Sequence, residues 1–141
     1  MASTIASRKS KGRRLQQYVR DTFRQIFKEQ LEPEDIESRP MGNSGTDIIL
    51  TPAARKLIPF DIEGKNSEKI NIWAAIRQAE SNQAKPERIP AVIFSRNHSK
   101  TYIVMEFERF LDLMYPGRSR TIPNEEPEVS VPPIVENTTE V

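Results

Sequence analysis

The sequence contains no cysteine and only one histidine among its 141 residues. These absences exclude disulfide bonds, thiolate metal sites, a cysteine nucleophile and any zinc cluster that needs several imidazoles. Catalytic chemistry in this chain therefore has to use carboxylates, hydroxyls or lysine. The same absence of cysteine is compatible with a reducing cytoplasm.

Long apolar runs are also missing, since no stretch approaches the roughly 20 apolar residues that a membrane helix needs. The first residues, MASTIASRKSK, lack the apolar middle of a signal peptide. We therefore expect a cytoplasmic protein with no membrane partner.

Glycine is scarce and proline frequent, with 5 glycines against 11 prolines. Hydrophobic residues make up 36% and charged residues 29%, which is the composition of a globular protein. The many prolines indicate that one stretch of the chain is unstructured. The length suits one domain. We predict a flexible basic arm at residues 1–11, a folded domain at 12–115 and a disordered tail rich in proline and glutamate at 116–141.

The net charge of +1 conceals an uneven distribution of charge. Residues 1–30 contain eight Lys/Arg and two acids, whereas residues 115–141 contain two arginines and five glutamates. A basic segment attached to a helix favours a polyanionic partner, usually nucleic acid, although the charged face of an ordinary surface helix looks the same. The predicted DNA-binding residues are Arg8, Lys9, Lys11, Arg13, Arg14, Arg20 and Arg24.

Hydrophobic periodicity predicts the order of helices and strands. Apolar residues three or four apart indicate helices, and short alternating or β-branched runs indicate strands. The predicted elements are a helix at 12–30, strands at 36–39, 46–50 and 58–65, a helix at 70–83, strands at 89–94 and 101–105, and a helix at 105–114. This order, α-β-β-β-α-β-β-α, predicts an α/β fold in which helices flank one mixed sheet.

Two groups of apolar residues on the predicted helices have two interpretations each. Trp73 adjoins an apolar stripe, so core packing is favoured over stacking on a nucleic-acid base. The last helix carries Phe107, Phe110, Leu111 and Met114 on one side. We expect these four in the core, with a dimer contact as the alternative.

The candidate site combines Asp47 with the tripeptide Glu63-Gly64-Lys65. Asp47 opens a strand after a glycine-containing loop, and Glu63 and Lys65 share one face of the next strand because side chains alternate. Two adjacent carboxylates are hard oxygen ligands suited to Mg²⁺, and a neighbouring lysine can hold an attacking water or help to deprotonate it. A polar sheet face with a solvated Glu/Lys pair is the alternative for the tripeptide alone.

The order of these segments carries a family resemblance. The segments are Lys11-Gly12 at the start of a basic helix, Ser44-Gly45-Thr46-Asp47, Phe60 to Asn66, and Ile72 to Ala75 followed by Gln78. Across roughly residues 9–113 the chain resembles PD-(D/E)xK nucleases, and among them the phage-borne and archaeal Holliday junction resolvases.

The resemblance implies a restriction-endonuclease-like fold and a Mg²⁺-dependent endonuclease, with Mn²⁺ able to substitute. Such enzymes nick DNA phosphodiesters, often as homodimers on a four-way junction, and take no small-molecule substrate. By the resemblance, Asp47 and Glu63 match the metal carboxylates and Lys65 matches the catalytic lysine. We therefore expect a Holliday junction resolvase that acts in DNA recombination, repair or phage DNA processing.

The chain departs from the family in its first helix, where the archaeal enzymes carry a glutamate that faces the metal. The corresponding turn here contains no acid, so Gln16 or Gln17 takes that place and one ion is favoured over two. Asp61 is either a further metal ligand or a surface carboxylate. Ser44 and Gln78 are possible supporting residues, although Gln78 also fits an exposed helical position.

Two other functions stay open at this point. One is a different structure-specific or single-strand DNA nuclease of the same fold. The other is a catalytically silent DNA-binding recombination partner, in which the missing helix acid reflects lost activity.

Overall fold

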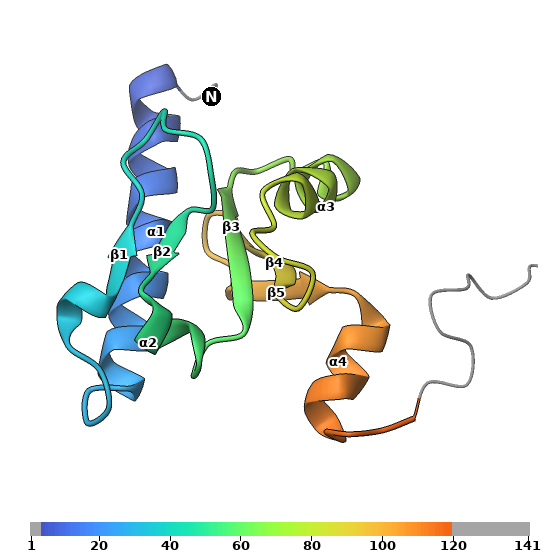
Figure 1. Cartoon of the computed structure of the whole chain (residues 1–141). Helices are drawn as coiled ribbons and strands as arrows, with labels where there is room; N and C mark the ends of the chain where they lie inside the picture. The colour runs from blue at the N-terminus through green and yellow to red at the C-terminus, as the bar shows by residue number, and fades with distance from the viewer. Residues whose placement is uncertain (1–3, 120–141) are drawn as a thin grey trace, which may run out of the picture. The chain divides into compact units, whose positions relative to one another are not determined.

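The computed structural model describes residues 4–119. It is a mixed α/β structure with two small sheets and flanking helices (Figure 1). The chain divides into two compact units, Met1–Phe110 and Leu111–Val141, and the first contains both sheets and every candidate site residue. In the second unit, Arg118 Nε donates to Asp112 Oδ1 at 3.0 Å. Most of the predicted tail, residues 120–141, lies outside the described residues.

Helix α1 (Ile5–Ile26) begins before the predicted start at Gly12. Thr4 caps this helix, because its hydroxyl accepts the Ser7 amide N–H at 3.0 Å and so satisfies one of the free donors of the first turn. The apolar stripe that predicts the helix starts only at Leu15, so periodicity does not report the polar turns before it. Residues 5–11, predicted to form a flexible arm, are helical instead.

The strands form two sheets rather than the single mixed sheet that the sequence predicts. In the first, β1 (Ile36–Ser38) and β2 (Ile48–Leu50) are antiparallel. The second has the order β3 (Phe60–Asn66), β4 (Ile89–Ser95) and β5 (Tyr102–Met105). One backbone hydrogen bond, from Asp47 N to Ile62 O at 2.8 Å, links the start of β2 to β3. β2 is too short for a full ladder.

Connections between the strands follow from their directions. β3 and β4 are parallel, so the chain crosses over through helix α3 (Ile72–Ser81), whereas β4 and β5 form an antiparallel hairpin. Short helices η1 (Pro33–Asp35) and α2 (Pro52–Arg55) flank the first sheet, and α2 replaces a predicted turn. Helix α4 (Phe107–Met114) follows β5. The predicted order of strands and main helices agrees with this structure.

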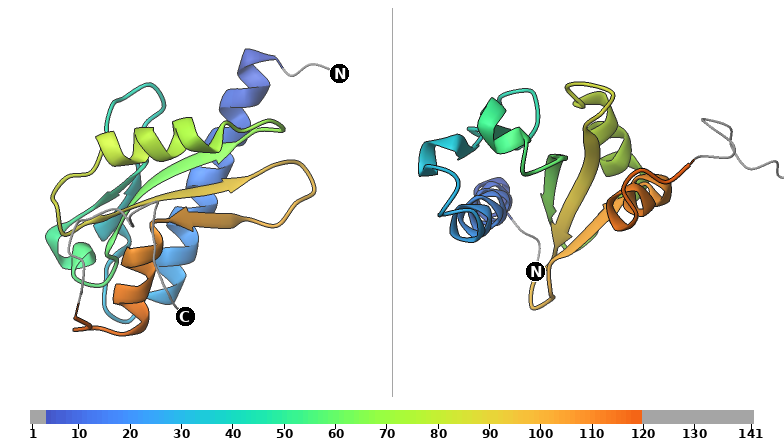
Figure 2. Two further views of the ribbon diagram at one scale, coloured as in Figure 1. Left: turned by 90° about the vertical axis from the view of Figure 1, so that its right-hand side faces the viewer. Right: turned by 60° about the horizontal axis from the view of Figure 1, so that its bottom comes forward.

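Helices α1 and α3 cover opposite faces of β3 and β4 (Figure 2). Leu15 and Val19 of α1 pack with Ile62 on one face, and Ala75 and Ala79 of α3 pack with Val92 on the other. The first cluster also contains Ile36, Ile48, Leu50, Ala54 and Ile58. The middle of β3 therefore lies between α1 and α3.

Some predicted core residues are exposed. Trp73 is 69% exposed, so its predicted core position is wrong. Phe107 is 68% and Phe110 43% exposed, and none of the residues of α4 is buried. In the described part of the chain, none of the helices has the length and apolar character required to cross a membrane.

Candidate functional site

Asp47 lies immediately before β2, with its carboxylate against the middle of β3. Its Oδ2 accepts the Gly64 amide N–H at 2.7 Å, while its own amide donates to Ile62 O at 2.8 Å. These two bonds attach Asp47 to β3 from both its backbone and its side chain. The carboxylate is therefore held next to the residue that separates Glu63 from Lys65.

Glu63 and Lys65 lie on one face of β3, as the alternation of side chains predicts. Glu63 is buried, with 3% of its surface exposed, and its Oε2 lies 3.5 Å from Lys65 Nζ. The predicted trio of Asp47, Glu63 and Lys65 is thus brought together in the structure, with the lysine at the solvent side of a buried carboxylate.

Both carboxyl groups have raised pKa values. Burial raises the pKa of Asp47, and the Gly64 N–H and then the Lys65 charge counteract that rise in part. Burial also raises the pKa of Glu63, and the neighbouring charge of Asp47 raises it further. A buried and a half-buried carboxylate that repel each other form an electrostatically unfavourable pair, and such pairs are typical of sites that bind a cation or transfer a proton.

Gln16 is the glutamine of α1 that reaches the site. Its side chain is buried and lies with the Asp47 carboxylate against Gly64, and its polar interaction with Asp47 lowers the pKa of that carboxyl. Gln17 follows it about 100° further around the helix, and the structure shows no contact from Gln17 to Asp47 or Glu63. Of the two predicted alternatives, Gln16 occupies the position beside the carboxylates.

Helix α3 contributes two amide side chains to the site. Lys65 Nζ donates to Gln78 Oε1 at 2.8 Å, so the predicted supporting role of Gln78 has a direct contact. Asn82, which the sequence analysis missed, donates from Nδ2 to Gly45 O at 3.3 Å and lies 3.5 Å from Glu63 Oε1. The spacing of four residues from Gln78 was the available signal, since it places Asn82 on the same helical face.

The loop before Asp47 is held by Arg39. Gly45 has a φ of +115°, and the Arg39 guanidinium lies so close that a Cβ at Gly45 would meet its Cζ at 2.7 Å. Arg39 Nε also donates to Thr46 O. Ser44 is exposed, and among the described residues it makes no hydrogen bond to the site. Glycine is therefore required at position 45, whereas Ser44 lies outside the assembled group.

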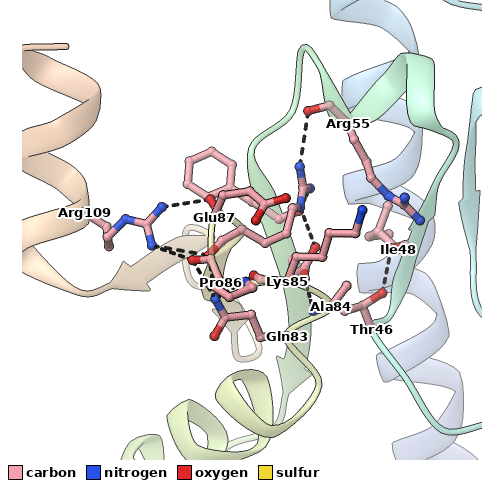
Figure 3. Close-up of polar contacts among 12 residues, drawn as sticks. Thr46, Ile48, Arg55, Gln83, Ala84, Lys85, Pro86, Glu87 and Arg109 are labelled. Carbon is pink, nitrogen blue, oxygen red and sulfur yellow. Dashed lines mark hydrogen bonds and ion pairs between the residues drawn. The ribbon is translucent and has the colours of Figure 1, made fainter. Parts of the chain in front are cut away.

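Asp61 belongs to a structural network instead of the site, and this network reaches Ala84 and Arg55, both of which are labelled in Figure 3. One oxygen accepts Arg88 Nε at 2.9 Å and the other accepts the Ala84 N–H at 2.8 Å. Arg88 also donates to Phe60 O and Arg55 O, and both ionic side chains are buried. Asp61 is therefore neither the predicted surface carboxylate nor available as a metal ligand while this pair is intact.

The predicted DNA-binding residues fall into two groups. Arg20 pairs with Asp21 at 2.8 Å, and Arg24 contacts Glu37 at 3.3 Å, so these two are engaged locally. Within residues 4–119, no carboxylate pairs with the residues of the first turns of α1. This N-terminal basic group consists of Arg8, Lys9, Lys11, Arg13 and Arg14.

The N-terminal basic group lies beside the end of β3. Asn66 Nδ2 donates to Lys11 O at 3.2 Å, and Asn66 is the last residue of the strand that carries Glu63 and Lys65. Lys11 of this group therefore lies next to the end of the strand that carries the site.

The acidic part of the site is a pair. Across the described range 4–119, no group of three or more His, Cys, Asp or Glu side chains is arranged to hold a metal ion. Oxygen atoms that can complete a coordination shell come from the Gln16 side chain and from water. Comparisons with protein families, curated proteins and solved structures gave no match.

Proposed function

We propose that this protein is a metal-dependent endonuclease of the PD-(D/E)xK type that hydrolyses DNA phosphodiesters. The observation that supports it best is the convergence of Asp47, Glu63 and Lys65, with Glu63 buried, Asp47 half-buried and the lysine at their solvent side. A solvated Glu/Lys pair on an ordinary sheet face would not leave Glu63 3% exposed beside a second carboxylate.

The donor atoms of the site fit a hard divalent cation. Asp47, Glu63 and Gln16 offer oxygen atoms only, which is the ligand chemistry of Mg²⁺ and Mn²⁺. The raised pKa values of the two carboxyls reflect burial and mutual repulsion that a cation would relieve. Since Gln16 is neutral, the charge of the pair suits one ion. A bound Mg²⁺ would supply Lewis acidity to the phosphate and lower the pKa of a bound water.

The side chains around the carboxylates have separate tasks in this proposal. Lys65 holds the attacking water or a phosphate oxygen with its ammonium group, and Gln78 fixes that group through the 2.8 Å hydrogen bond. Hydrolysis adds the water oxygen to phosphorus and breaks the bond to the 3′ oxygen, leaving a 5′-phosphate and a 3′-hydroxyl. Asn82 fixes Glu63 relative to the loop at Gly45.

The substrate we propose is branched DNA, with the four-way junction first. The order of elements is compatible with the restriction-endonuclease-like fold of the junction resolvases that the sequence resembles. The N-terminal basic group, whose Lys11 lies beside the end of β3, supplies contacts for backbone phosphates, which carry no sequence information. Processing of flaps or single strands by the same site is the nearest competing activity.

Nicking of synthetic DNA tests the proposal. The full chain is incubated with four-way junction, flap, duplex and single-stranded DNA, with Mg²⁺ or with a chelator. We expect metal-dependent nicking that is fastest on the junction and lost in Glu63→Gln. Glu80→Gln, an exposed carboxylate on α3, is the matched control and should cut normally. Faster cleavage of another DNA form would reassign the substrate.

Calorimetry with Mn²⁺ separates an inactive enzyme from a silent DNA-binding module. The proposed site predicts binding of close to one ion per chain that Glu63→Gln weakens. DNA binding without any metal binding or cleavage would support the silent module and overturn the nuclease proposal.

A further inference from the structure

In the part of the chain that the structure describes, strand β5 has an edge that no other strand covers. It pairs with β4 on one side, and among residues 4–119 no strand pairs with its other side (Figure 2). The far edge of the first sheet differs, because the Arg24 guanidinium donates to the Ile36 carbonyl of β1 at 2.9 Å. An uncovered edge offers backbone donors and acceptors to another strand, and proteins usually block such edges.

Apolar side chains are exposed on both faces of this edge. Tyr102 and Ile103 point to opposite faces because neighbouring strand residues alternate, and they are 54% and 50% exposed. Ile103 lines an apolar groove of about 320 Å³ next to α1, together with Tyr18 and Phe23. An added strand that brings its own neighbouring elements would cover both faces at once.

We propose that β5 pairs antiparallel with β5 of a second copy of this chain, about a two-fold axis at Ile103. The three strands of each copy then form one continuous sheet of six strands. A two-fold pairing is closed, so it leaves no further edge at this site and stops at a dimer. The inference stands on the strand edge and does not require the nuclease function.

Charge fixes the register of this pairing. Lys100 and Glu106 lie three residues before and three residues after Ile103, and both are exposed. With the axis at Ile103, Lys100 faces the second copy's Glu106 at each end of the paired segment. A shift of the axis to a point between Ile103 and Val104 would place Lys100 against Phe107 and remove both ion pairs. A foreign strand would need the same charges at both ends, whereas a second copy supplies them by symmetry.

Sedimentation of the full chain across a concentration series tests the dimer. We expect a reversible monomer–dimer equilibrium, with a Kd raised about tenfold by Lys100→Glu, because two symmetric pairs change from attraction to repulsion. Glu106→Lys should have the same effect, and the double exchange Lys100→Glu with Glu106→Lys should restore the original Kd. A monomer at every concentration, an open series of larger species, or no rescue by the double exchange overturns the proposal.

A single introduced thiol locates the interface, since the chain has no cysteine of its own. Ile103→Cys should give a dimer with a short thiol-specific crosslinker, because directly opposed residues have Cβ atoms about 5 Å apart. Lys56→Cys, an exposed position away from β5, is the collision control. Equal crosslinking of the two variants contradicts the β5 interface. Neither experiment measures cleavage, so a chain that does not dimerise would not contradict the proposed nuclease activity. A chain that dimerises but does not cut DNA would not contradict the β5 interface.

Discussion

Lys65 donates its ammonium hydrogen bond to Gln78 at 2.8 Å while remaining 3.5 Å from the Glu63 carboxylate. The lysine is therefore held from two elements, by its own strand neighbour on β3 and by α3. A long lysine side chain with two partners loses much of its rotational freedom before any substrate arrives, which is the requirement for a group that positions a water or a phosphate.

Removal of either partner separates the roles of Lys65 and Gln78. We expect Lys65→Ala to lower the single-turnover cleavage rate by roughly 100-fold or more, and Gln78→Ala by about tenfold, the effect of removing one hydrogen bond. Both variants should keep their Mn²⁺ affinity in calorimetry. Arg77→Ala, at the neighbouring exposed position, is the control for α3. Loss of Mn²⁺ binding in Lys65→Ala would contradict the positioning role.

Asp47→Asn and Glu63→Gln should each reduce cleavage to less than about a tenth of the native rate, because removal of a metal ligand costs several kcal/mol in the transition state. Junction binding, measured in a gel-shift assay with a chelator, should change little in either variant. If either variant cuts at more than about a tenth of the native rate, the carboxylate that it replaces is not a metal ligand.

The same substitutions should stabilise the metal-free protein at neutral pH. Because the folded-state pKa values of Asp47 and Glu63 are raised, the folded state binds more protons than the unfolded state in this range. The free energy of unfolding should therefore fall as pH rises from about 4, the usual range of these carboxyls, through the raised values.

Urea denaturation in a chelator at several pH values measures this contribution. The difference between the native chain and Glu63→Gln isolates it, since other carboxyls titrate in both proteins. We expect the variant to gain stability relative to the native chain as pH rises, and an added divalent cation to reverse that order. A difference that is constant across the pH range would show that the pair is not electrostatically unfavourable.

Asp61 and Arg88 should matter for stability and not for metal binding. Arg88→Ala leaves the Asp61 carboxylate buried without its charge partner, so we expect a loss of about 3–5 kcal/mol in the free energy of unfolding. Arg96→Ala, at an exposed hairpin position, should stay within about 0.5 kcal/mol of the native value. If Asp61→Asn, measured where it is folded, lowers Mn²⁺ affinity as strongly as Glu63→Gln, Asp61 is a ligand after all.

The sequence predicts the order of elements and the central trio because both depend on short-range patterns. Alternation along β3 assigns Glu63 and Lys65 to one face, and the structure agrees. The position of Asp47 beside them needs only that neighbouring strands adjoin. The start of α1 was missed because Thr4 and the polar turns after it carry capping chemistry and no apolar period.

Long-range pairing explains the other differences. Asp61 and Arg88 are separated by 27 residues and meet only through the folded loop after α3, so periodicity gives no sign of their ion pair. Asn82 likewise contacts Gly45 across 37 residues. The division into two sheets depends on how few backbone bonds β2 makes with β3, which no local pattern in the sequence reports.

The N-terminal basic group and the paired arginines of α1 should differ in their effect on DNA binding. Neutralising Arg8, Lys9, Lys11 and Arg13 together should weaken junction binding and reduce the slope of log K against log salt by roughly 0.9 for each DNA phosphate that the protein no longer neutralises. Binding is measured at several salt concentrations in a chelator, so cleavage does not interfere.

Arg20→Gln with Arg24→Gln is the matched control, because these arginines already pair with Asp21 and Glu37. The control should leave the salt slope unchanged, and it should lower stability, since Arg24 also donates to the Ile36 carbonyl. Equal slopes for the native chain and the four-residue variant would show that the group makes no phosphate contacts. A reduced slope in the control instead would move the DNA contact toward the C-terminal half of α1.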